Sequence, residues 1–417
     1  RNMRRSLGLT IVTFFVFLCL ISTPILSAQL TRLKSSHAEL TQERLPSDML
    51  FDLSLRSTMI RGKIPSVAAG IIQDEELVWQ KGYGWYDFQG FKTADEYTIY
   101  QIASVSKTVT ATALLQLYEQ GLFDLDDDVN EYLPFSLRNP LYPNTPITFR
   151  MLLSHHASLH DHDEITAYEY FEGNYALSYL SEILDPSGSD FHPEFWGENK
   201  PGTGGNYSNM GFTVLGYLVE LLSGQDLESY CQEHIFRPLQ MHNTSFDLNS
   251  LNQDQIACQY FRFGRIYLKT PLVDYTFLDP CGGLLSCVDD LSRYFIAHMN
   301  NGMYQDVQIL HETTIKEMHT IQYPESAPYY GILRFGLGWL IFEEEFGIKA
   351  HGHDGDLGFS HARLRIFNDN NSALIYLFNK GFRPSILPRI IPNLLENQAD
   401  KHIRKLLYEK ALAEYSI

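Results

Sequence analysis

The chain has 417 residues, of which 44% are hydrophobic and 13% aromatic, so it can bury a core of the size found in enzymes. Its formal net charge of -18 argues against a nucleic-acid partner, because phosphate binding requires clustered Lys and Arg residues that this chain lacks. Small-molecule or peptide substrates and neutral polymers remain open as ligands. We expect one enzyme-sized unit with two lobes.

The first 28 residues have the pattern of a targeting segment. Three arginines precede an apolar run over residues 7–21, and Ser27 and Ala28 supply the small side chains of a cleavage site. We expect the protein to be exported, so that cleavage after Ala28 would release it as a secreted, extracytoplasmic protein. An uncleaved segment would instead anchor it to a membrane. Residues 29–44 are polar and are expected to form a linker.

The folded domain is expected to begin with a helix over Leu45–Ile60. The β-rich runs Ser66–Gln73 and Leu77–Tyr83 flank a polar turn and predict a hairpin. Ala362–Phe367 and Ala373–Phe378 predict a second hairpin near the other end of the chain. We expect strands from the two chain ends to share one antiparallel sheet.

The middle of the chain has mainly helical patterns. Thr108–Tyr118 and Phe212–Leu222 each end at a glycine, Leu227–Phe236 ends before Pro238, and a further helix is expected from Ser286 to Gly302. The predicted fold is α+β, an antiparallel sheet from both chain ends flanked by helices, with an inserted, mainly helical lobe over about 108–280. This domain is expected to span 45–395, and residues 396–417 are expected to form a charged helical tail.

Ser104 and Lys107 open one of these helices in the sequence Ser104-Val105-Ser106-Lys107. Residues three positions apart share a helix face, so the hydroxyl and the amine are expected to meet in the first turn. Free backbone N–H groups there also favour developing negative charge. Such a pair can activate a serine nucleophile, although the pattern alone also fits a helix cap with a solvated lysine.

Two later segments could complete a site around this serine. Tyr207-Ser208-Asn209 follows a glycine-rich loop and precedes an apolar helix, so a loop would present a phenol and an amide close together. His353-Asp354-Gly355 precedes a second glycine-containing turn, and its glycine would let a strand approach a ligand closely.

Together these segments resemble the serine β-lactamase and penicillin-binding protein superfamily, in the branch of class C β-lactamases, esterases and D-amino-acid peptidases. The resemblance extends from about Leu45 to Phe378. It also includes the motifs Met151-Leu152-Leu153-Ser154-His155, Glu233-His234-Ile235-Phe236-Arg237-Pro238-Leu239 and Gly282-Gly283-Leu284. The resemblance implies a serine hydrolase with a β-lactamase/transpeptidase-like fold.

By this resemblance Ser104 is the nucleophile and forms an acyl-enzyme that water then releases. Lys107 eases the deprotonation of Ser104, and Tyr207 relays protons as base and then as acid. Asn209 would hydrogen-bond the substrate or hold Lys107. The implied reaction requires no metal ion and no organic cofactor.

The resemblance also implies a third element, His353-Asp354-Gly355, on a strand beside the nucleophile. His353 would orient the tyrosine of the site or a substrate carboxylate. The backbone N–H groups of Ser104 and of Asp356, just past Gly355, would form the oxyanion hole. The carboxylates of Asp354 and Asp356 are expected to repel an anionic substrate by an amount of order 1 kcal/mol each, which favours an ester, amide or amine-bearing substrate.

Paired histidines offer a metal site as an alternative interpretation. His160-Asp161-His162-Asp163-Glu164 and His351-x-His353 each place two imidazoles two positions apart. The first run lacks the Asp-His continuation of the metallo-β-lactamase pattern and falls between helical segments. We therefore favour structural or solvated histidines over metal ligands at both places.

The cysteines of the domain lie far apart in the sequence. Cys231, Cys258, Cys281 and Cys287 allow three disulfide pairings in an oxidising compartment. Their spacing fits neither a zinc site nor a dense disulfide framework, so buried free thiols are at least as well supported.

The sequence leaves a second class of function open. In it the fold is a catalytically weak or inactive penicillin-binding-like module that senses or binds a ligand. The complete set Ser104, Lys107, Tyr207 and Asn209 favours an enzyme instead. We predict an exported serine hydrolase that acts through an acyl-enzyme at Ser104 on a small amide, ester, β-lactam or D-amino-acid peptide.

Overall fold

A computed structural model describes residues 47–161, 176–263, 266–272, 276–329, 331, 333–345, 348–382 and 392–415. The chain divides into two units, Arg1–Leu53 and Ser54–Ile417. In the first unit the described residues are 47–53, which are the first residues of helix α2 (Ser47–Gly62). The predicted targeting segment and linker lie outside the described residues. Among the described residues no helix is long and apolar enough to cross a membrane.

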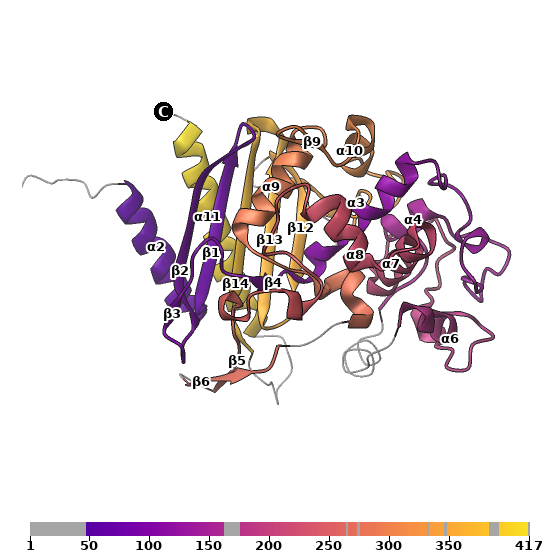
Figure 1. The fold of residues 1–417 in the computed structure, drawn as a ribbon, viewed down its shortest axis with the longest axis horizontal. Coiled ribbons are helices and arrows are strands. Elements are labelled where there is room, and N and C mark those ends of the chain that lie inside the picture. Colours follow the sequence, from indigo (N-terminus) through magenta and orange to yellow (C-terminus); the bar gives the residue numbers. More distant parts are fainter. Residues whose placement is uncertain are drawn as a thin grey trace, which may run out of the picture. The chain divides into compact units, whose positions relative to one another are not determined.

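The second unit is built around an eight-stranded sheet in which neighbouring strands run antiparallel (Figure 1). The two predicted hairpins form its centre, because one strand of the first hairpin also pairs with a strand of the second. In spatial order the strands are β10 (Leu333–Phe335), β11 (Leu340–Glu345), β12 (Ile348–Asp356), β13 (Ser360–Phe367), β14 (Ser372–Asn379), β1 (Ser66–Gln73), β2 (Glu76–Asp87) and β3 (Lys92–Thr93).

Short strands extend this framework. One small sheet has the order β15 (Gly381–Phe382), β5 (Gln259–Phe263) and β6 (Ile266–Thr270). Two strand pairs are β4 (Tyr100–Gln101) with β7 (Leu285–Ser286), and β8 (Met303–Tyr304) with β9 (Val307–Gln308). The β4–β7 pair matters for the site, because the chain leaves β4 directly into the segment that carries Ser104.

Helices pack on both faces of the large sheet (Figure 1). On one face lies α9 (Val288–Met299), where Val288 occupies the space that a side chain at Gly70 of β1 would need. On the other lies α11 (Pro392–Tyr415), from which Asp400 reaches Arg363 of β13. The α+β fold predicted from the sequence is therefore confirmed. The predicted C-terminal tail falls largely within α11, which begins earlier, at Pro392.

The inserted segment contains the predicted helices with small changes at their ends. They are α3 (Ser106–Glu119), α7 (Asn209–Ser223) and α8 (Leu227–Cys231). The segment also contains the short helices α4 (Phe149–Leu153) and α6 (Leu180–Leu184), and α10 (Glu312–Met318) follows α9. The helix predicted over Leu227–Phe236 changes from α8 to a π-helical turn at Gln232–Phe236. α7 is followed by Gly224, whose φ of 72° is the left-handed conformation that terminates helices.

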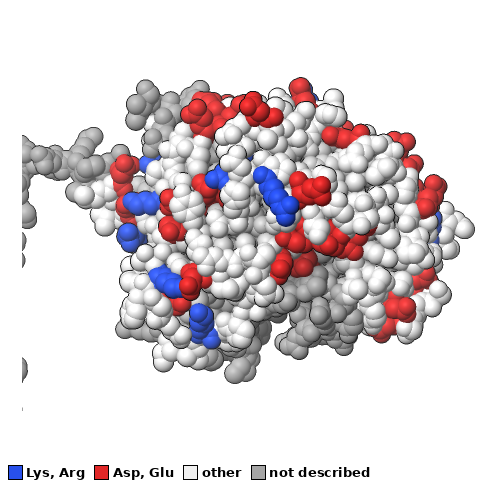
Figure 2. Space-filling model, in the orientation of Figure 1, with Lys and Arg blue, Asp and Glu red and all other residues white. Residues whose placement is uncertain are grey.

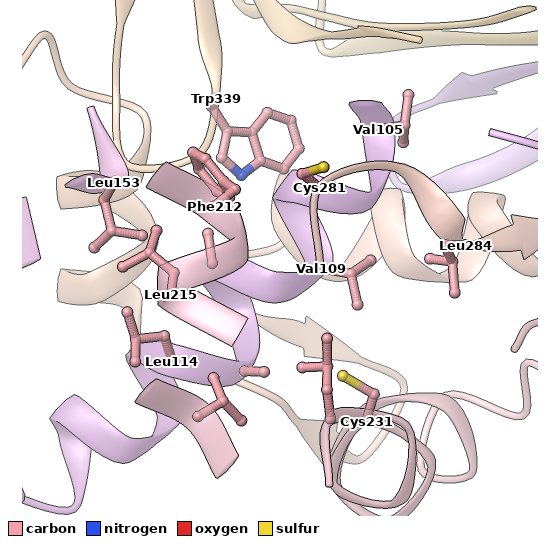
Figure 3. Packing of buried hydrophobic residues seen from close by; sticks show 14 of the residues in the cluster. Val105, Val109, Leu114, Leu153, Phe212, Leu215, Cys231, Cys281, Leu284 and Trp339 are labelled. Atoms are coloured by element: carbon pink, nitrogen blue, oxygen red, sulfur yellow. The ribbon is translucent and has the colours of Figure 1, made fainter. Parts of the chain in front are cut away.

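The main hydrophobic core fills the space around α3 and α7. Val109 and Leu114 of α3 and Phe212 and Leu215 of α7 are fully buried and belong to one cluster with Trp339, which lies beside Phe212 (Figure 3). Within the described residues the cysteines Cys231, Cys258, Cys281 and Cys287 are all buried free thiols, which confirms the free-thiol interpretation. Burial of this apolar surface holds α3, and with it the segment before α3, at a fixed position.

Three histidines lie beside Trp339 in the second unit. The ring centroids of His298, His319 and His351 are 4.7, 4.4 and 5.7 Å from the indole. Burial, followed by the proximity of His351, lowers the pKa of His298 to about 3, and burial lowers the pKa of His351 to about 4. Burial also lowers the pKa of His319 well below its ordinary value. These side chains are therefore neutral in the folded protein.

The free energy of unfolding is expected to fall as the pH drops from about 6.5 towards 4, because histidines in the unfolded chain bind protons that the folded cluster excludes. Each such proton contributes a slope of about 1.4 kcal/mol per pH unit, and this stabilisation is complete above about pH 6.5. Chemical denaturation followed by tryptophan fluorescence measures the slope. His351→Phe should make the slope shallower, whereas exposed His242→Gln should not. Equal slopes in the two variants would contradict the expectation.

Candidate active site

Ser104 lies on a sharp turn between β4 and α3. It belongs to a 3-10 turn over Ala103–Val105 that continues directly into α3, so it precedes the α-helix that the sequence predicted to contain it. Ala103 has φ 51°, a left-handed conformation that costs a non-glycine residue roughly 1–2 kcal/mol. A backbone hydrogen bond fixes the start of the turn, since the Ile102 N–H donates to Leu284 O at 2.9 Å. Strained turns of this kind are found where a nucleophile must be presented.

Two serines lie in this segment, and their surroundings differ. Ser106 is fully buried, its hydroxyl donates to Ala103 O at 2.6 Å, and it accepts from the Leu284 N–H at 3.1 Å. These bonds make Ser106 a structural residue. Ser104 is partly exposed, and its Oγ lies 3.1 Å from Lys107 Nζ. Ser104 is therefore the serine that is available for chemistry.

Lys107 is fully buried among polar partners. Its Nζ donates to Asn209 Oδ1 and to the Cys281 carbonyl oxygen, both at 2.6 Å. Both partners can only accept, so the two N–H bonds of a neutral amine are used by them and its lone pair is left for Ser104. Burial lowers the pKa of Lys107 to about 8, although Asp161 opposes this shift. About a tenth of Lys107 is thus a free base at pH 7, far more than for an ordinary lysine, and the free base predominates above about pH 8.

Asn209 is the first residue of α7, where Asp161 contacts it from the loop after α4. Ser208 caps the helix by accepting from the Gly211 N–H at 3.0 Å. Asp161 accepts from the Asn209 backbone N–H at 2.8 Å and from its side-chain amide at 2.7 Å. Sequence reasoning considered Asp161 only in the metal interpretation, and no local motif pointed to this contact.

Tyr207 lies directly beside the amine and the serine. Its ring centroid is 4.9 Å from Lys107 Nζ. Burial raises the pKa of Tyr207 well above its ordinary value, although a hydrogen bond with Ser104 opposes the shift. His155 stacks on the Tyr207 ring at 4.4 Å and accepts from the Ser208 N–H at 3.1 Å. Tyr207 is therefore a neutral phenol that His155 holds in place.

His353 completes the group from β12. Its ring centroid is 6.2 Å from that of Tyr207, and the side chain is buried. A carbonyl oxygen can only accept, so the 2.7 Å contact with Asp354 O identifies Nδ1 as the protonated nitrogen. Burial, followed by the nearby Lys107, lowers the pKa of His353 to about 3. The imidazole is neutral and offers no positive charge to a carboxylate.

The register of the sheet separates His353 from its acidic neighbours. One row of cross-strand partners is His353, Leu364, Ile375 and Gly70, on the α9 face, and the adjacent row is Asp354, Arg363, Tyr376 and Ala69, on the α11 face. Asp354 contacts Arg365 at 2.8 Å, and Asp356 contacts Arg363 at 2.9 Å and also His361. The expected repulsion of anionic substrates by these carboxylates was wrong, because both are turned away from Ser104 and paired with arginines.

Gly355 packs against the backbone that precedes Ser104. A Cβ at this position would lie 2.0 Å from Ile102 O and 3.1 Å from the Ala103 Cβ, so only glycine fits. This contact holds the end of β12 beside the Ser104 turn. The predicted oxyanion-hole groups, the N–H of Ser104 and the N–H of Asp356 just after Gly355, thus belong to two segments in contact.

Gly355→Ala is expected to lower the rate of Ser104 acylation by roughly 10- to 100-fold, because the added methyl must push β12 away from the Ser104 turn. Gly211→Ala is the matched control, since a Cβ there would make only ordinary contacts of 3.6 Å or more inside α7. Single-turnover acylation of both variants, with thermal unfolding as a check on folding, measures the effect. An acylation rate for Gly355→Ala equal to that of the control would contradict the packing argument.

One histidine pair of the metal interpretation, His351 and His353, is split in the structure. His351 belongs to the cluster around Trp339, whereas His353 lies beside Tyr207. His162 and the acidic residues that follow it lie outside the described residues. Across the ranges that the structure describes, no group of three or more His, Cys, Asp or Glu side chains could hold a metal ion.

The family model described as Beta-lactamase matches residues 51–396, so the chain belongs to the Beta-lactamase family and the resemblance seen in the motifs is confirmed. Protein flp of Staphylococcus aureus (strain MW2) is 25% identical over 376 residues, which cover 88% of this chain and 70% of that protein. Beta-lactamase-like protein 2 of Dictyostelium discoideum is 26% identical over 325 residues, which cover 73% of this chain and 55% of that protein.

Solved structures show the same fold at low sequence identity. The octameric penicillin-binding protein homologue from Pyrococcus abyssi has a TM-score of 0.68 at 24% sequence identity. The matched region covers 85% of this chain and 76% of the homologue's chain. The D-amino acid amidase from Ochrobactrum anthropi SV3 has a TM-score of 0.68 at 17% sequence identity. The matched region covers 86% of this chain and 99% of the amidase chain. These likenesses confirm the β-lactamase/transpeptidase-like fold.

Proposed function

We propose that the protein is a serine hydrolase in which Ser104 attacks an acyl carbon and forms an acyl-enzyme. The observation that carries the proposal is the set of partners around Lys107. In the structure Lys107 Nζ donates to Ser104 Oγ at 3.1 Å, as well as to Asn209 Oδ1 and Cys281 O. Those two oxygens can only accept, so in a neutral amine they take both N–H bonds and the lone pair is left facing Ser104 Oγ. This geometry is that of a general base placed on a nucleophile.

The proposed reaction has two halves. In the first, the Ser104 proton moves to Lys107 as Oγ bonds to the acyl carbon, and the leaving group departs with a proton returned from Lys107 directly or through Tyr207. In the second, water attacks the ester and Ser104 regains its proton. The raised pKa of Tyr207 favours the Lys107 amine, not a tyrosinate, as the base of the first half.

The proposed substrates are small amides and esters, including amides of D-amino acids. The neutral His353 supports this choice, because it lacks the positive charge that would hold the carboxylate of a β-lactam or a D-alanyl peptide. The formal net charge of -18 disfavours anionic substrates through long-range repulsion, and acidic side chains predominate on the face shown in Figure 2. The D-amino acid amidase among the structural neighbours supports the amide class. Export and membrane association stay predictions from the N-terminal sequence.

Labelling with a fluorophosphonate tests the proposal. The wild-type protein should be modified at Ser104, and Ser104→Ala should not be modified. A substrate panel of nitrocefin, p-nitrophenyl esters and D-aminoacyl anilides then identifies the leaving group. Equal labelling of both proteins would refute the assignment, and labelling without turnover of any substrate would favour the sensing or binding module.

A further inference from the structure

Asp161 collects hydrogen bonds at the N-terminus of α7. Its Oδ1 accepts from the backbone N–H groups of Asn209 at 2.8 Å and Met210 at 3.4 Å, and its Oδ2 accepts from Asn209 Nδ2 at 2.7 Å. Burial raises the pKa of Asp161, while the nearby Lys107 and the backbone N–H groups of Asn209 and Met210 oppose that shift. These donors favour the ionised carboxylate, which can only accept.

This contact decides which way the Asn209 amide faces. An amide has a donor side and an acceptor side, and an ionised carboxylate binds only the donor side. Nδ2 must therefore face Asp161, which leaves Oδ1 facing Lys107 Nζ at 2.6 Å. With the opposite orientation Nδ2 would face the amine, and the lone pair of a neutral Lys107 would turn towards it and away from Ser104.

We propose that Asp161 is a positioning residue that fixes the Asn209 amide and thereby directs the Lys107 lone pair at Ser104. The inference rests on the proposed function and extends it by one residue. Asp161 does not touch the reacting atoms. It acts through Asn209, so its loss should change the protonation behaviour of Lys107 as well as the rate.

Asp161 also sets the charge around Lys107. The titratable groups that face Lys107 in the described residues are Ser104, Asp161, Tyr207, Cys281, His155 and His353. Burial raises the pKa of Cys281 to about 11 and that of Tyr207 well above its ordinary value, and the two histidines are neutral. The negative charge near Lys107 therefore comes from the ionised form of Asp161, which raises the Lys107 pKa. Removing that charge should make Lys107 easier to deprotonate.

Asp161→Asn is the sharpest single test, because the new amide keeps an acceptor for the helix N-terminus. Its N–H groups would face Asn209 and turn that amide over. Acylation of Ser104 by a fluorophosphonate is expected to slow by roughly 10- to 100-fold, while the midpoint of its pH dependence shifts to lower pH. Exposed Asp254→Asn is the matched control and should change neither quantity.

Exchanging the carboxyl group at position 161 with the amide at position 209 is expected to restore part of the acylation rate. Asn209→Asp alone places two carboxylates 2.7 Å apart and should also slow acylation. In the double variant Asp161→Asn with Asn209→Asp, the amide at position 161 donates to the carboxylate at position 209, which again presents an acceptor to Lys107. The double variant should acylate faster than either single variant, with a midpoint at higher pH than the wild type.

Carbon NMR titration of the Lys107 ε-methylene measures the apparent pKa of Lys107 and does not depend on catalysis. The apparent pKa of Lys107 should fall in Asp161→Asn and rise in the double variant. A double variant no faster than the slower single variant, or a Lys107 titration unmoved in both, would overturn the inference. Absence of wild-type labelling would instead refute the proposed function, and the titration would still decide whether Asp161 controls Lys107.

Discussion

Lys107→Met is expected to slow the acylation of Ser104 by about 10²- to 10⁴-fold, the usual contribution of a positioned general base. Methionine fills a similar volume, so the change removes the lone pair more than it disturbs packing. The reason for the large effect is geometric, because the Lys107 Nζ is the basic atom 3.1 Å from Ser104 Oγ. Single-turnover acylation with a fluorophosphonate measures the loss, and exposed Lys316→Met is the control.

The same base sets the pH dependence of the wild-type protein. A protonated Lys107 has no lone pair, so acylation should rise with pH and level off above a midpoint near the Lys107 pKa of about 8. In Lys107→Met this rise should disappear. A variant that retains both the wild-type rate and the wild-type midpoint would remove Lys107 from the mechanism.

Arg363→Met is expected to lower the free energy of unfolding by about 3 kcal/mol, because it leaves acidic partners in place without their cation. Arg363 is buried between β13 and α11, where its Nε donates to Asp400 Oδ2 at 3.0 Å and its Nη2 donates to Asp356 at 2.9 Å. Most of the effect should come from the buried Asp400, since the carboxylate of Asp356 is half exposed and screened by water.

Equilibrium denaturation measures this loss of stability, and Lys92→Met provides the control. Lys92 pairs with Asp254 at 2.8 Å in an exposed salt bridge, which contributes little to stability because water screens it. A loss below about 1 kcal/mol for Arg363→Met would contradict the account of why acidic residues are tolerated next to His353.

The sequence contained enough information for the framework. β-rich runs on either side of polar turns identified both hairpins, and glycine stops placed α3 and α7 within a few residues of their observed ends. The motifs around Ser104 and Tyr207 indicated which residues belong to one site. Local patterns sufficed because strand pairing and helix ends depend on neighbouring residues.

The orientation of Asp354 and Asp356 could have been inferred from strand alternation. If His353 and Gly355 face the serine, the residues between and after them face the opposite side of the sheet. Arg363 and Arg365, two positions apart on the next strand, were the corresponding signal. The error came from treating charge near a motif as charge in the site.

Other features of the site have no local signal. Asp161 and Asn209 are 48 positions apart, and the run around Asp161 resembles a metal motif. The three histidines around Trp339 come from α9, from the end of α10 and from β12. Only the tertiary packing brings such residues together, so they could not be predicted from spacing.

The central claim is that Ser104, activated by Lys107, carries the acyl group during turnover. Mass spectrometry of peptides from wild-type protein, quenched during hydrolysis of a D-aminoacyl anilide or a p-nitrophenyl ester that it turns over, tests this most directly. The account predicts an acyl group on Ser104, and neither an adduct nor turnover in Ser104→Ala. An acyl group on Ser106, or undiminished turnover by Ser104→Ala, would contradict it.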